Sequence, residues 1–261
     1  MLANKCTLAG LRVRGVHMAI YAISDLHLSF AQPKPMDIFG PAWENYVDRL
    51  RENWDSVVQP ADVVLLPGDL SWAMTLPEAM PDLNFLEERP GRKVLTRGNH
   101  DYWWPRLGTN RIQRLVDKEF TFIQGTSTVI DGVGITGTRG WRVDWEMTGR
   151  PGDAVTQSGE SPDSEQANRI YNRELAYLEK GLQSIPDSVD VKIAMLHFPP
   201  FDEQLQPNEF ARLLAKYSVD YLVYGHIHLG IGSWVNGEVE GVMYRIVSAD
   251  IVDFHPQLIL K

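Results

Sequence analysis

Short runs of apolar and β-branched residues alternate along the chain with segments of helical periodicity. Val63–Pro67 and Val191–Leu196 are almost wholly apolar and have the length of buried strands. Strands that alternate with helices predict an α/β layered fold. The strands expected from this pattern are Ala19–Ser24, Val63–Pro67, Lys93–Arg97, Thr121–Gln124, Ser127–Ile130, Val133–Thr136, Val191–Leu196, Tyr221–Tyr224 and Val242–Val247.

Helical periodicity is clearest between Trp43 and Val58. The apolar residues that share one helical face there are Trp43, Tyr46, Val47, Leu50, Trp54, Val57 and Val58. A second helix is expected to begin at Thr75, where Pro77 and Glu78 supply an early proline and a capping-box acid. Two further helices are predicted around Tyr171, Leu175, Leu178 and Leu182, and around Phe210, Leu213, Leu214 and Tyr217.

The domain pattern begins at Met18, directly before the first strand. Residues 1–17 carry three basic residues, no acid and no sustained apolar stretch, which argues against a signal peptide. We expect residues 1–17 to be a disordered leader or an over-long gene start, and residues 18–261 to form a single domain. Gly, Pro, Ser and acidic residues gather at about 150–165, which predicts a mobile loop, either a lid over the site or a disordered insertion.

Composition narrows the class of protein. A chain of 261 residues with 44% hydrophobic content has ample material for a packed core. The net charge of −9 argues against broad binding of the protein to nucleic acid or to an anionic membrane surface, so no extended nucleic-acid-binding surface is expected. No run of 18 or more apolar residues exists, so no membrane span is expected. The single cysteine, Cys6, excludes an intrachain disulfide and favours a cytoplasmic location.

Five short blocks place metal-binding residue types directly after predicted strands. They are Ser24-Asp25-Leu26-His27, Pro67-Gly68-Asp69, Arg97-Gly98-Asn99-His100-Asp101, Leu196-His197-Phe198-Pro199 and Gly225-His226-Ile227-His228. In open α/β sheets ligands bind at the carboxyl ends of the strands, so five separated loops can converge on one site. Glycine precedes the polar residue in three of the blocks, which permits tight turns and close approach of the backbone.

The residue types in these blocks predict a particular chemistry. Imidazole, carboxylate and amide groups without a thiolate suit Mn, Fe, Co, Ni or Zn. The members of the pairs Asp25/His27 and His226/His228 stand two residues apart, so both can face the same side of an extended segment. One carboxylate, best assigned to Asp69, can bridge two ions. Two ions roughly 3.5–4 Å apart clamp phosphate oxygens and lower the pKa of a bridging water, which attacks directly as hydroxide.

The five blocks, in this order from Asp25 to His228, resemble the signature of calcineurin-like metallophosphoesterases. The resemblance implies a four-layer αββα sandwich in which two mixed β-sheets are flanked by helices. It also implies two divalent ions per chain, Mn or Fe, with Zn, Co or Ni as alternatives. The implied ligands are Asp25, His27, Asp69 and His228 for the first ion, and Asp69, Asn99, His197 and His226 for the second. His100 would contact the phosphate and act as the general acid.

One block departs from the pattern of the family's protein phosphatases. In those enzymes the Gly-Asp pair is followed by a second Asp, which orients the catalytic His, and then by an Arg. Here Trp72 stands at the place of that Asp and the Arg is missing. A protein Ser/Thr phosphatase is therefore disfavoured, and the group that orients His100 is left open. The expected substrate is a small phosphorylated molecule, either a phosphodiester or a phosphomonoester; the oligomeric state is left open.

Each block by itself also has a structural interpretation. His197 alone fits a buried core histidine, Asp25 and Asp69 fit helix N-caps, and Asn99 fits a turn. Because all five blocks occur together and in order, metal ligation is favoured over these structural roles. Asp101 is expected to make structural hydrogen bonds.

Residues outside the blocks fit more ordinary roles. His17 and His255 have no partner block and are expected at the surface. The aromatic segment 102–104 is expected to pack in the core or line a cleft, with substrate contact as the lesser alternative. Arg139 fits a phosphate contact or, equally, a surface turn.

Two competing functions follow from the same residues. A catalytically silent scaffold or binding protein that retains the fold is the alternative to the hydrolase, although such a protein would be expected to have lost ligands. A structural or redox zinc protein is disfavoured because no Cys-x-x-Cys pair can form.

Overall fold

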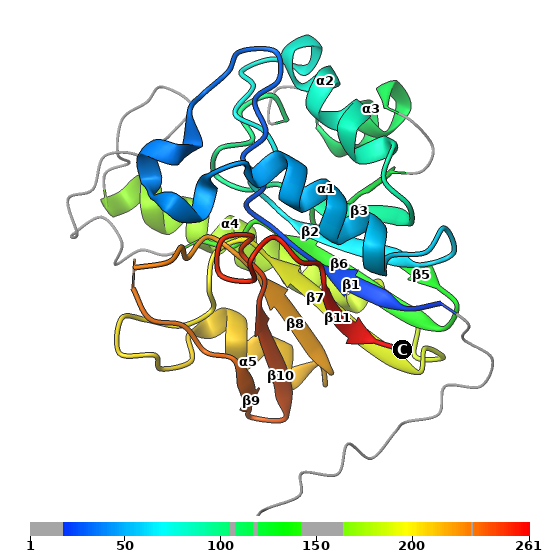
Figure 1. Cartoon of the computed structure of the whole chain (residues 1–261). Helices are drawn as coiled ribbons and strands as arrows, with labels where there is room; N and C mark the ends of the chain where they lie inside the picture. Colours follow the sequence, from blue (N-terminus) through cyan, green and yellow to red (C-terminus); the bar gives the residue numbers. More distant parts are fainter. Residues whose placement is uncertain (1–17, 105–107, 117–119, 142–163, 231) are drawn as a thin grey trace, which may run out of the picture.

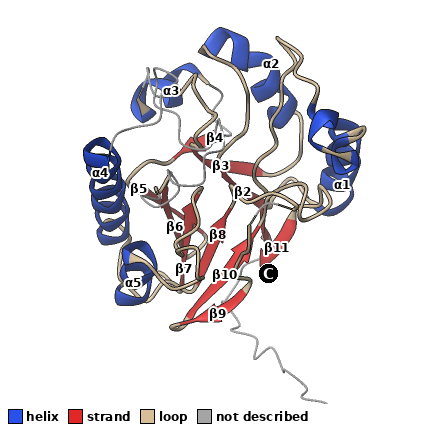
Figure 2. Cartoon of the chain, turned by 90° about the vertical axis from the view of Figure 1, so that its left-hand side faces the viewer, coloured by secondary structure: helices blue, strands red, loops and turns tan. Residues whose placement is uncertain are grey.

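The computed structural model describes residues 18–104, 108–116, 120–141, 164–230 and 232–261. Two β-sheets pack face to face, and helices cover both outer faces (Figure 1, Figure 2). This is the four-layer αββα sandwich of mixed sheets that the family resemblance implied, and it fits the α/β layered fold that the strand and helix pattern predicted. The expected leader, residues 1–17, lies outside the described residues, as does the expected loop at 150–165 up to residue 163.

The first sheet contains five strands in the order β11-β1-β2-β3-β4. They are β1 (Ile20–Ala22), β2 (Val63–Pro67), β3 (Arg92–Thr96), β4 (Phe120–Phe122) and β11 (Gln257–Leu260). Strands β1 to β4 run parallel, whereas β11 pairs antiparallel with β1 at the edge. The carboxyl ends of β1, β2 and β3 therefore lie side by side.

The second sheet contains six strands in the order β5-β6-β7-β8-β10-β9. They are β5 (Thr126–Ile130), β6 (Val133–Thr138), β7 (Val191–Leu196), β8 (Tyr221–Tyr224), β9 (Gly237–Val239) and β10 (Val242–Ile246). Strands β6, β7, β8 and β10 are parallel, and the antiparallel strands β5 and β9 form the edges. This sheet also presents a row of carboxyl ends at one edge.

Helices α1 (Tyr46–Val57), α2 (Leu76–Glu87) and α3 (Thr109–Leu115) cover the first sheet, and α4 (Ser164–Gln183) and α5 (Glu209–Lys216) cover the second. The short 3₁₀ helices η1 (Met36–Phe39) and η2 (Pro41–Trp43) precede α1. The predicted start of α2 is confirmed, because Thr75 is its N-cap and Glu78 Oε2 accepts the Thr75 N–H at 3.1 Å. Within the described residues, no helix combines the length and apolar character that a membrane span requires.

An apolar layer between the sheets holds them together. Ile20, Leu65, Val94, Ile135 and Ile193 are fully buried there and belong to strands of both sheets. Burial of each such side chain stabilises the fold by about 1.5–3 kcal/mol. Because this layer fixes the sheets face to face, it also fixes the two rows of strand ends next to each other.

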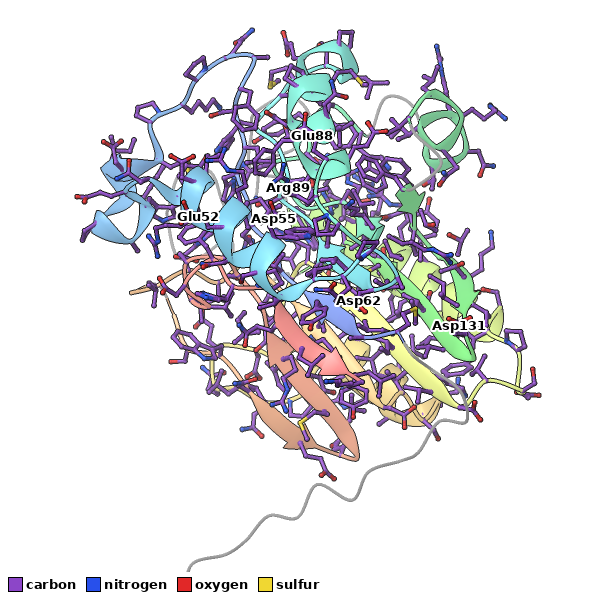
Figure 3. The ribbon with its side chains drawn as sticks, turned by 45° about the vertical axis from the view of Figure 1, so that its right-hand side comes forward. Glu52, Asp55, Asp62, Glu88, Arg89 and Asp131 are labelled. Carbon is purple, nitrogen blue, oxygen red and sulfur yellow. The ribbon has the colours of Figure 1, made fainter. Side chains whose placement is uncertain are left out.

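Polar contacts fasten the opposite, amino-terminal ends of the strands. Arg89 joins the end of α2 to α1, since its Nη1 lies 2.5 Å from Asp55 Oδ2 and its Nη2 lies 3.4 Å from Glu88 Oε2 (Figure 3). Asp62 accepts the N–H of Ala19 at 2.8 Å, directly before β1. These contacts lie far from the strand ends that carry the polar blocks.

Candidate metal centre

The first group of donor atoms comes from the loops after β1 and β8. One donor atom each from Asp25, His27 and His228 lie within 4.8 Å of one another. His228 Nε2 is 3.7 Å from Asp25 Oδ1, and His27 Nε2 is 3.9 Å from Asp69 Oδ2. The Asp25 carboxylate and two imidazoles thus face a common point, and the Asp69 carboxylate lies beside His27.

The second group comes from the loops after β2, β3, β7 and β8. Asn99 Oδ1 lies 2.6 Å from His197 Nε2 and 3.1 Å from His226 Nδ1, and the two ring nitrogens are 3.2 Å apart. His197 Nε2 is also 3.4 Å from Asp69 Oδ2. Asp25, Asp69 and His197 again have donor atoms within 4.8 Å of one another. The structure therefore brings all seven predicted ligand residues together, with both carboxylates between the two groups.

Backbone hydrogen bonds lock the loops to one another. The N–H of Asp25 donates to Gly68 O at 3.0 Å, and the N–H of His27 donates to Asp69 O at 3.0 Å. The N–H of His226 donates to both carboxylate oxygens of Asp25, at 3.1 and 3.0 Å. The loops after β1 and β2 are thus joined through main-chain groups, and the Asp25 carboxylate joins the loop after β1 to the loop after β8 in the other sheet.

Four of the seven residues have left-handed backbone conformations. The φ angles are 56° at Asp25, 48° at His27, 53° at Asp69 and 72° at His226. Residues with a Cβ rarely adopt this region, and each such position costs about 1–3 kcal/mol unless the surroundings compensate. Strain of this kind concentrates at functional sites, and its clustering here marks the loops as constrained by the placement of side chains.

Two glycines allow the backbone to approach the carboxylates. A Cβ on Gly98 would lie 2.0 Å from Asp69 Oδ1, and a Cβ on Gly225 would lie 2.1 Å from Asp25 Oδ2. No side chain fits at such distances. The close approach expected from the glycine in these blocks is confirmed.

Asp101 is the structural anchor of two of these loops. Its Oδ2 accepts the N–H groups of Gly98 at 2.8 Å and Asp69 at 2.9 Å. Its Oδ1 accepts those of Leu70 at 3.0 Å and Ser71 at 3.2 Å, and also the Trp103 indole N–H at 3.2 Å. The predicted structural role of Asp101 is confirmed.

His100 lies at the rim of the cluster, half-buried among aromatic rings. Its Nδ1 is 3.3 Å from the Tyr102 hydroxyl, and its ring centre is 4.2 Å from that of Trp72. Its Nε2 is 3.9 Å from Asp69 Oδ2. Trp72, which replaces the orienting Asp of the protein phosphatases, stacks on His27 with an interplanar angle of 25°. An aromatic wall and a tyrosine hydroxyl therefore surround His100.

The buried charges shift one another's pKa. Burial raises the pKa of Asp25. In Asp69, burial also acts to raise the pKa, but the charges of His197 and His100 outweigh it and hold the pKa well below its ordinary value. In His197, burial acts to lower the pKa, but the Asp69 carboxylate outweighs it and raises the pKa. An ionised Asp69 is thus compatible with this site.

The neighbouring imidazoles behave differently. Burial lowers the pKa of His27 and of His226 well below the ordinary value, so both rings are neutral at physiological pH. Neutral imidazoles and ionised carboxylates are the forms in which these groups bind metals. The donor set and the convergence of its atoms fit divalent cations such as Mn, Fe, Co, Ni or Zn. Burial acts to lower the pKa of His228, but its carboxylate partners raise the pKa to about 9, so this ring would have to lose a proton to bind one.

Arg139 is not a surface residue in a turn, and that alternative is wrong. It is 5% exposed, its guanidinium lies 4.6 Å from the Trp141 ring centre, and its Nη2 is 3.8 Å from Glu174 Oε1. Its carbonyl oxygen accepts the N–H of His197 at 3.0 Å. Burial and the charge of Arg97 lower the pKa of Arg139 to about 9, which still leaves it positive at neutral pH.

The structure also places most of the residues that the sequence analysis set outside the metal site. Trp103 and Trp104 are buried core residues, as expected, and Tyr102 lies beside His100. His255 is exposed as predicted, and His17 lies outside the described residues. Sequence reasoning missed Asp250, whose Oδ1 lies 3.0 Å from His228 Nδ1.

Comparisons with known proteins agree with this fold. The profile of the calcineurin-like phosphoesterase family matches residues 18–230. The chain is also similar in fold to phosphopantetheinyl hydrolase (PptH) from Mycobacterium tuberculosis, with a TM-score of 0.59 and 17% identity over 93% of this chain and 95% of that one. A protein of unknown function from Aquifex aeolicus, AQ665, gives a TM-score of 0.47 and 17% identity over 92% and 95% of the two chains.

Two curated phage proteins match a shorter segment. The chain is 39% identical over 83 residues to the Gene 66 protein of Mycobacterium phage D29, which covers 31% of this chain and 40% of that protein. It is 36% identical over 78 residues to the Gene 66 protein of Mycobacterium phage L5, which covers 30% and 37%. The chain thus spans less than half the length of either curated relative.

Proposed function

Because the chain belongs to the calcineurin-like phosphoesterase family, we propose that it is a metal-dependent hydrolase that cleaves a small phosphomonoester or phosphodiester. The observation that carries this proposal is the convergence of seven donor side chains from five strand ends. The left-handed backbone at four of them supports a selected geometry rather than a chance cluster.

Two divalent ions, Mn or Fe, are the proposed cofactors. Asp69 would be shared between them, since its Oδ2 lies 3.9 Å from His27 Nε2 and 3.4 Å from His197 Nε2. The proposed ligands are Asp25, His27, Asp69 and His228 for one ion, and Asp69, Asn99, His197 and His226 for the other. When bound, two such ions polarise phosphoryl oxygens and lower the pKa of water.

His100 is the proposed general acid. His100 would act as the imidazolium: its Nδ1–H then donates to the Tyr102 hydroxyl oxygen 3.3 Å away, and its Nε2–H lies on the side that faces the cluster, 3.9 Å from Asp69 Oδ2. The half-buried position leaves the ring within reach of a substrate, while the Trp72 ring restrains its orientation. His100 would donate this proton to the leaving oxygen as the phosphoester bond breaks.

Hydrolysis of p-nitrophenyl phosphate and bis(p-nitrophenyl) phosphate with added Mn²⁺ tests the proposal. Asp69→Asn and His226→Ala should each lose at least about a hundredfold in rate, because second-shell changes alone cost 10–100-fold and these remove ligands. Asp131→Asn and His255→Ala, two exposed positions away from the cluster, are the matched controls. Unchanged rates in both site variants would refute the hydrolase, and a metal-loaded protein inert on a wide phosphoester panel would favour the scaffold.

A further inference from the structure

Asp250 lies in the turn after β10, outside residues 18–230 that match the family. Its side chain is only 2% exposed, and it contacts the loop after β8 through both oxygens. Oδ1 lies 3.0 Å from His228 Nδ1, and Oδ2 accepts the N–H of Leu229 at 2.9 Å. One carboxylate therefore holds both the ring and the backbone of this loop.

The two nitrogens of the His228 ring face different partners. Nδ1 points to Asp250, whereas Nε2 lies 3.7 Å from Asp25 Oδ1, within the first group of donor atoms. A carboxylate that is ionised accepts hydrogen bonds and donates none, so the ring proton belongs on Nδ1. The lone pair is then left on Nε2, where the donor group converges.

Asp250 is itself held in place relative to Asp25. The N–H of Ala249 donates to Ser24 O at 2.9 Å, and Ser248 and Ser24 form a parallel bridge. The His228 side chain, by contrast, is 23% exposed, and its nearest ring neighbour, His27, is 5.4 Å away between centroids. Asp250 therefore supplies a fixed hydrogen bond to a ring that is partly exposed to solvent.

We propose that Asp250 is a positioning residue that fixes the tautomer and the direction of His228, so that Nε2 is presented to a divalent cation. This role rests on the proposed function, because it requires the metal centre. A carboxylate that accepts the second N–H of a metal-bound histidine orients the ring and raises its basicity, and its loss lowers metal affinity by about 10–100-fold.

This role can be tested without measuring activity. The metal-free full-length protein is titrated with Mn²⁺, and binding is monitored by calorimetry and electron paramagnetic resonance. The wild type should bind two ions. Asp250→Asn should weaken one of them by roughly 10–100-fold and leave the other unchanged. Asp253→Asn is the matched control, because Asp253 lies in the same turn, is exposed and pairs with Arg49 at the surface. It should bind Mn²⁺ as the wild type does.

A double-mutant cycle separates positioning from general support of the fold. In a His228→Ala background, Asp250→Asn should lower Mn²⁺ affinity by less than about twofold further, since its effect passes through the missing ring. A purely structural Asp250 would instead lower affinity by the same factor in both backgrounds, and that outcome overturns the proposal.

A second readout needs no variant and covers the case in which Asp250→Asn does not fold. In the Zn²⁺-loaded wild type with ¹⁵N-labelled histidine, nuclear magnetic resonance should show His228 protonated at Nδ1 and coordinated at Nε2. The reverse tautomer overturns the positioning role. A wild type that binds no divalent ion would refute the metal centre itself, whereas two bound ions with unchanged affinity in a folded Asp250→Asn would refute only Asp250.

Discussion

His228 lies between two carboxylates, and its protonation depends on both. Burial acts to lower the pKa of this ring, but the hydrogen bond with Asp250 and the charge of Asp25 outweigh burial and raise the pKa to about 9. In the metal-free protein His228 is therefore positive at neutral pH. A bound cation would have to displace that proton, so metal binding and protonation compete at this residue.

The raised pKa predicts a pH-dependent stability of the metal-free protein. An unfolded histidine titrates near 6.5, so the stabilisation by protonated His228 is complete below that pH and is lost as the pH rises through 9. The loss is on the order of 3 kcal/mol. Urea unfolding of the chelated protein at pH 6.5 and 9.5 should show it in the wild type and largely abolish it in His228→Gln. An equal loss in both proteins would contradict the assignment.

Tyr102 offers a test of how His100 works. Tyr102→Phe keeps the ring and removes only the hydroxyl that lies 3.3 Å from His100 Nδ1. If that contact positions a general acid, kcat for a substrate with a poor leaving group, such as phenyl phosphate, should fall about tenfold. With p-nitrophenyl phosphate the loss should be smaller, because this leaving group needs little protonation. Tyr171→Phe, which removes a hydroxyl bound to Glu209 at the surface, is the control; equal losses for both substrates would argue against the role.

At the scale of elements, burial explains which strands the sequence predicts well. The bounds of β2, β7 and β8 agree with the predicted runs, and nearly all their residues are buried, so the apolar pattern is continuous. Strands β9 and β11 were not predicted, because they are short, half-exposed edge strands whose pairing depends on β10 and β1. Helix α3 was missed as well; its seven residues bury only Ile112.

For the site, the residues that could be predicted are those with a local sequence signal, and those that could not be predicted depend on contacts between distant segments. The ligand-type residues stand in short blocks directly after strands, so local sequence was sufficient to find them. Asp250 has no such local signal. It is 22 residues from His228 in sequence, and the two residues meet because β8 and β10 are neighbouring strands. Tyr102 is only two residues from His100. This closeness in sequence is a local signal that its hydroxyl could contact the His100 ring.

Replacement of Asp101 is expected to destabilise the loops that its carboxylate holds together. Asp101→Asn replaces one accepting oxygen by an NH₂ group, so at least two of the N–H donors that now bind the carboxylate would face another donor. Each buried donor left without an acceptor costs about 1–3 kcal/mol, so the free energy of unfolding should fall by at least about 2 kcal/mol. Chemical denaturation measures it. Asp131→Asn, an exposed hairpin residue with a φ of 46° that asparagine tolerates, should change stability by less than about 0.5 kcal/mol.

At the scale of the whole molecule, the proposed metal centre joins the two sheets. Asp25, Asp69 and Asn99 follow strands of the five-stranded sheet, whereas His197 and His226 follow strands of the six-stranded sheet. Between the sheets, β1, β2, β6 and β7 contribute buried apolar side chains to one shared cluster. The sheets therefore pack through apolar contacts, and ions bound at the proposed centre would add a second connection at the carboxyl ends of the strands.

This arrangement predicts that metal ions stabilise the fold without being required for it. A ligand that binds only the native state at a hundred times its Kd stabilises it by about 2.7 kcal/mol, which for a chain of this size raises Tm by roughly 5–10 °C. Chelation should lower Tm by that amount while the far-ultraviolet spectrum stays native, and Mn²⁺ should restore it. Asp69→Asn should not respond to Mn²⁺, because it lacks the carboxylate between both groups, whereas Asp131→Asn should respond fully. A wild-type Tm that is the same with chelator and with saturating Mn²⁺ would mean that no ion connects the two sheets.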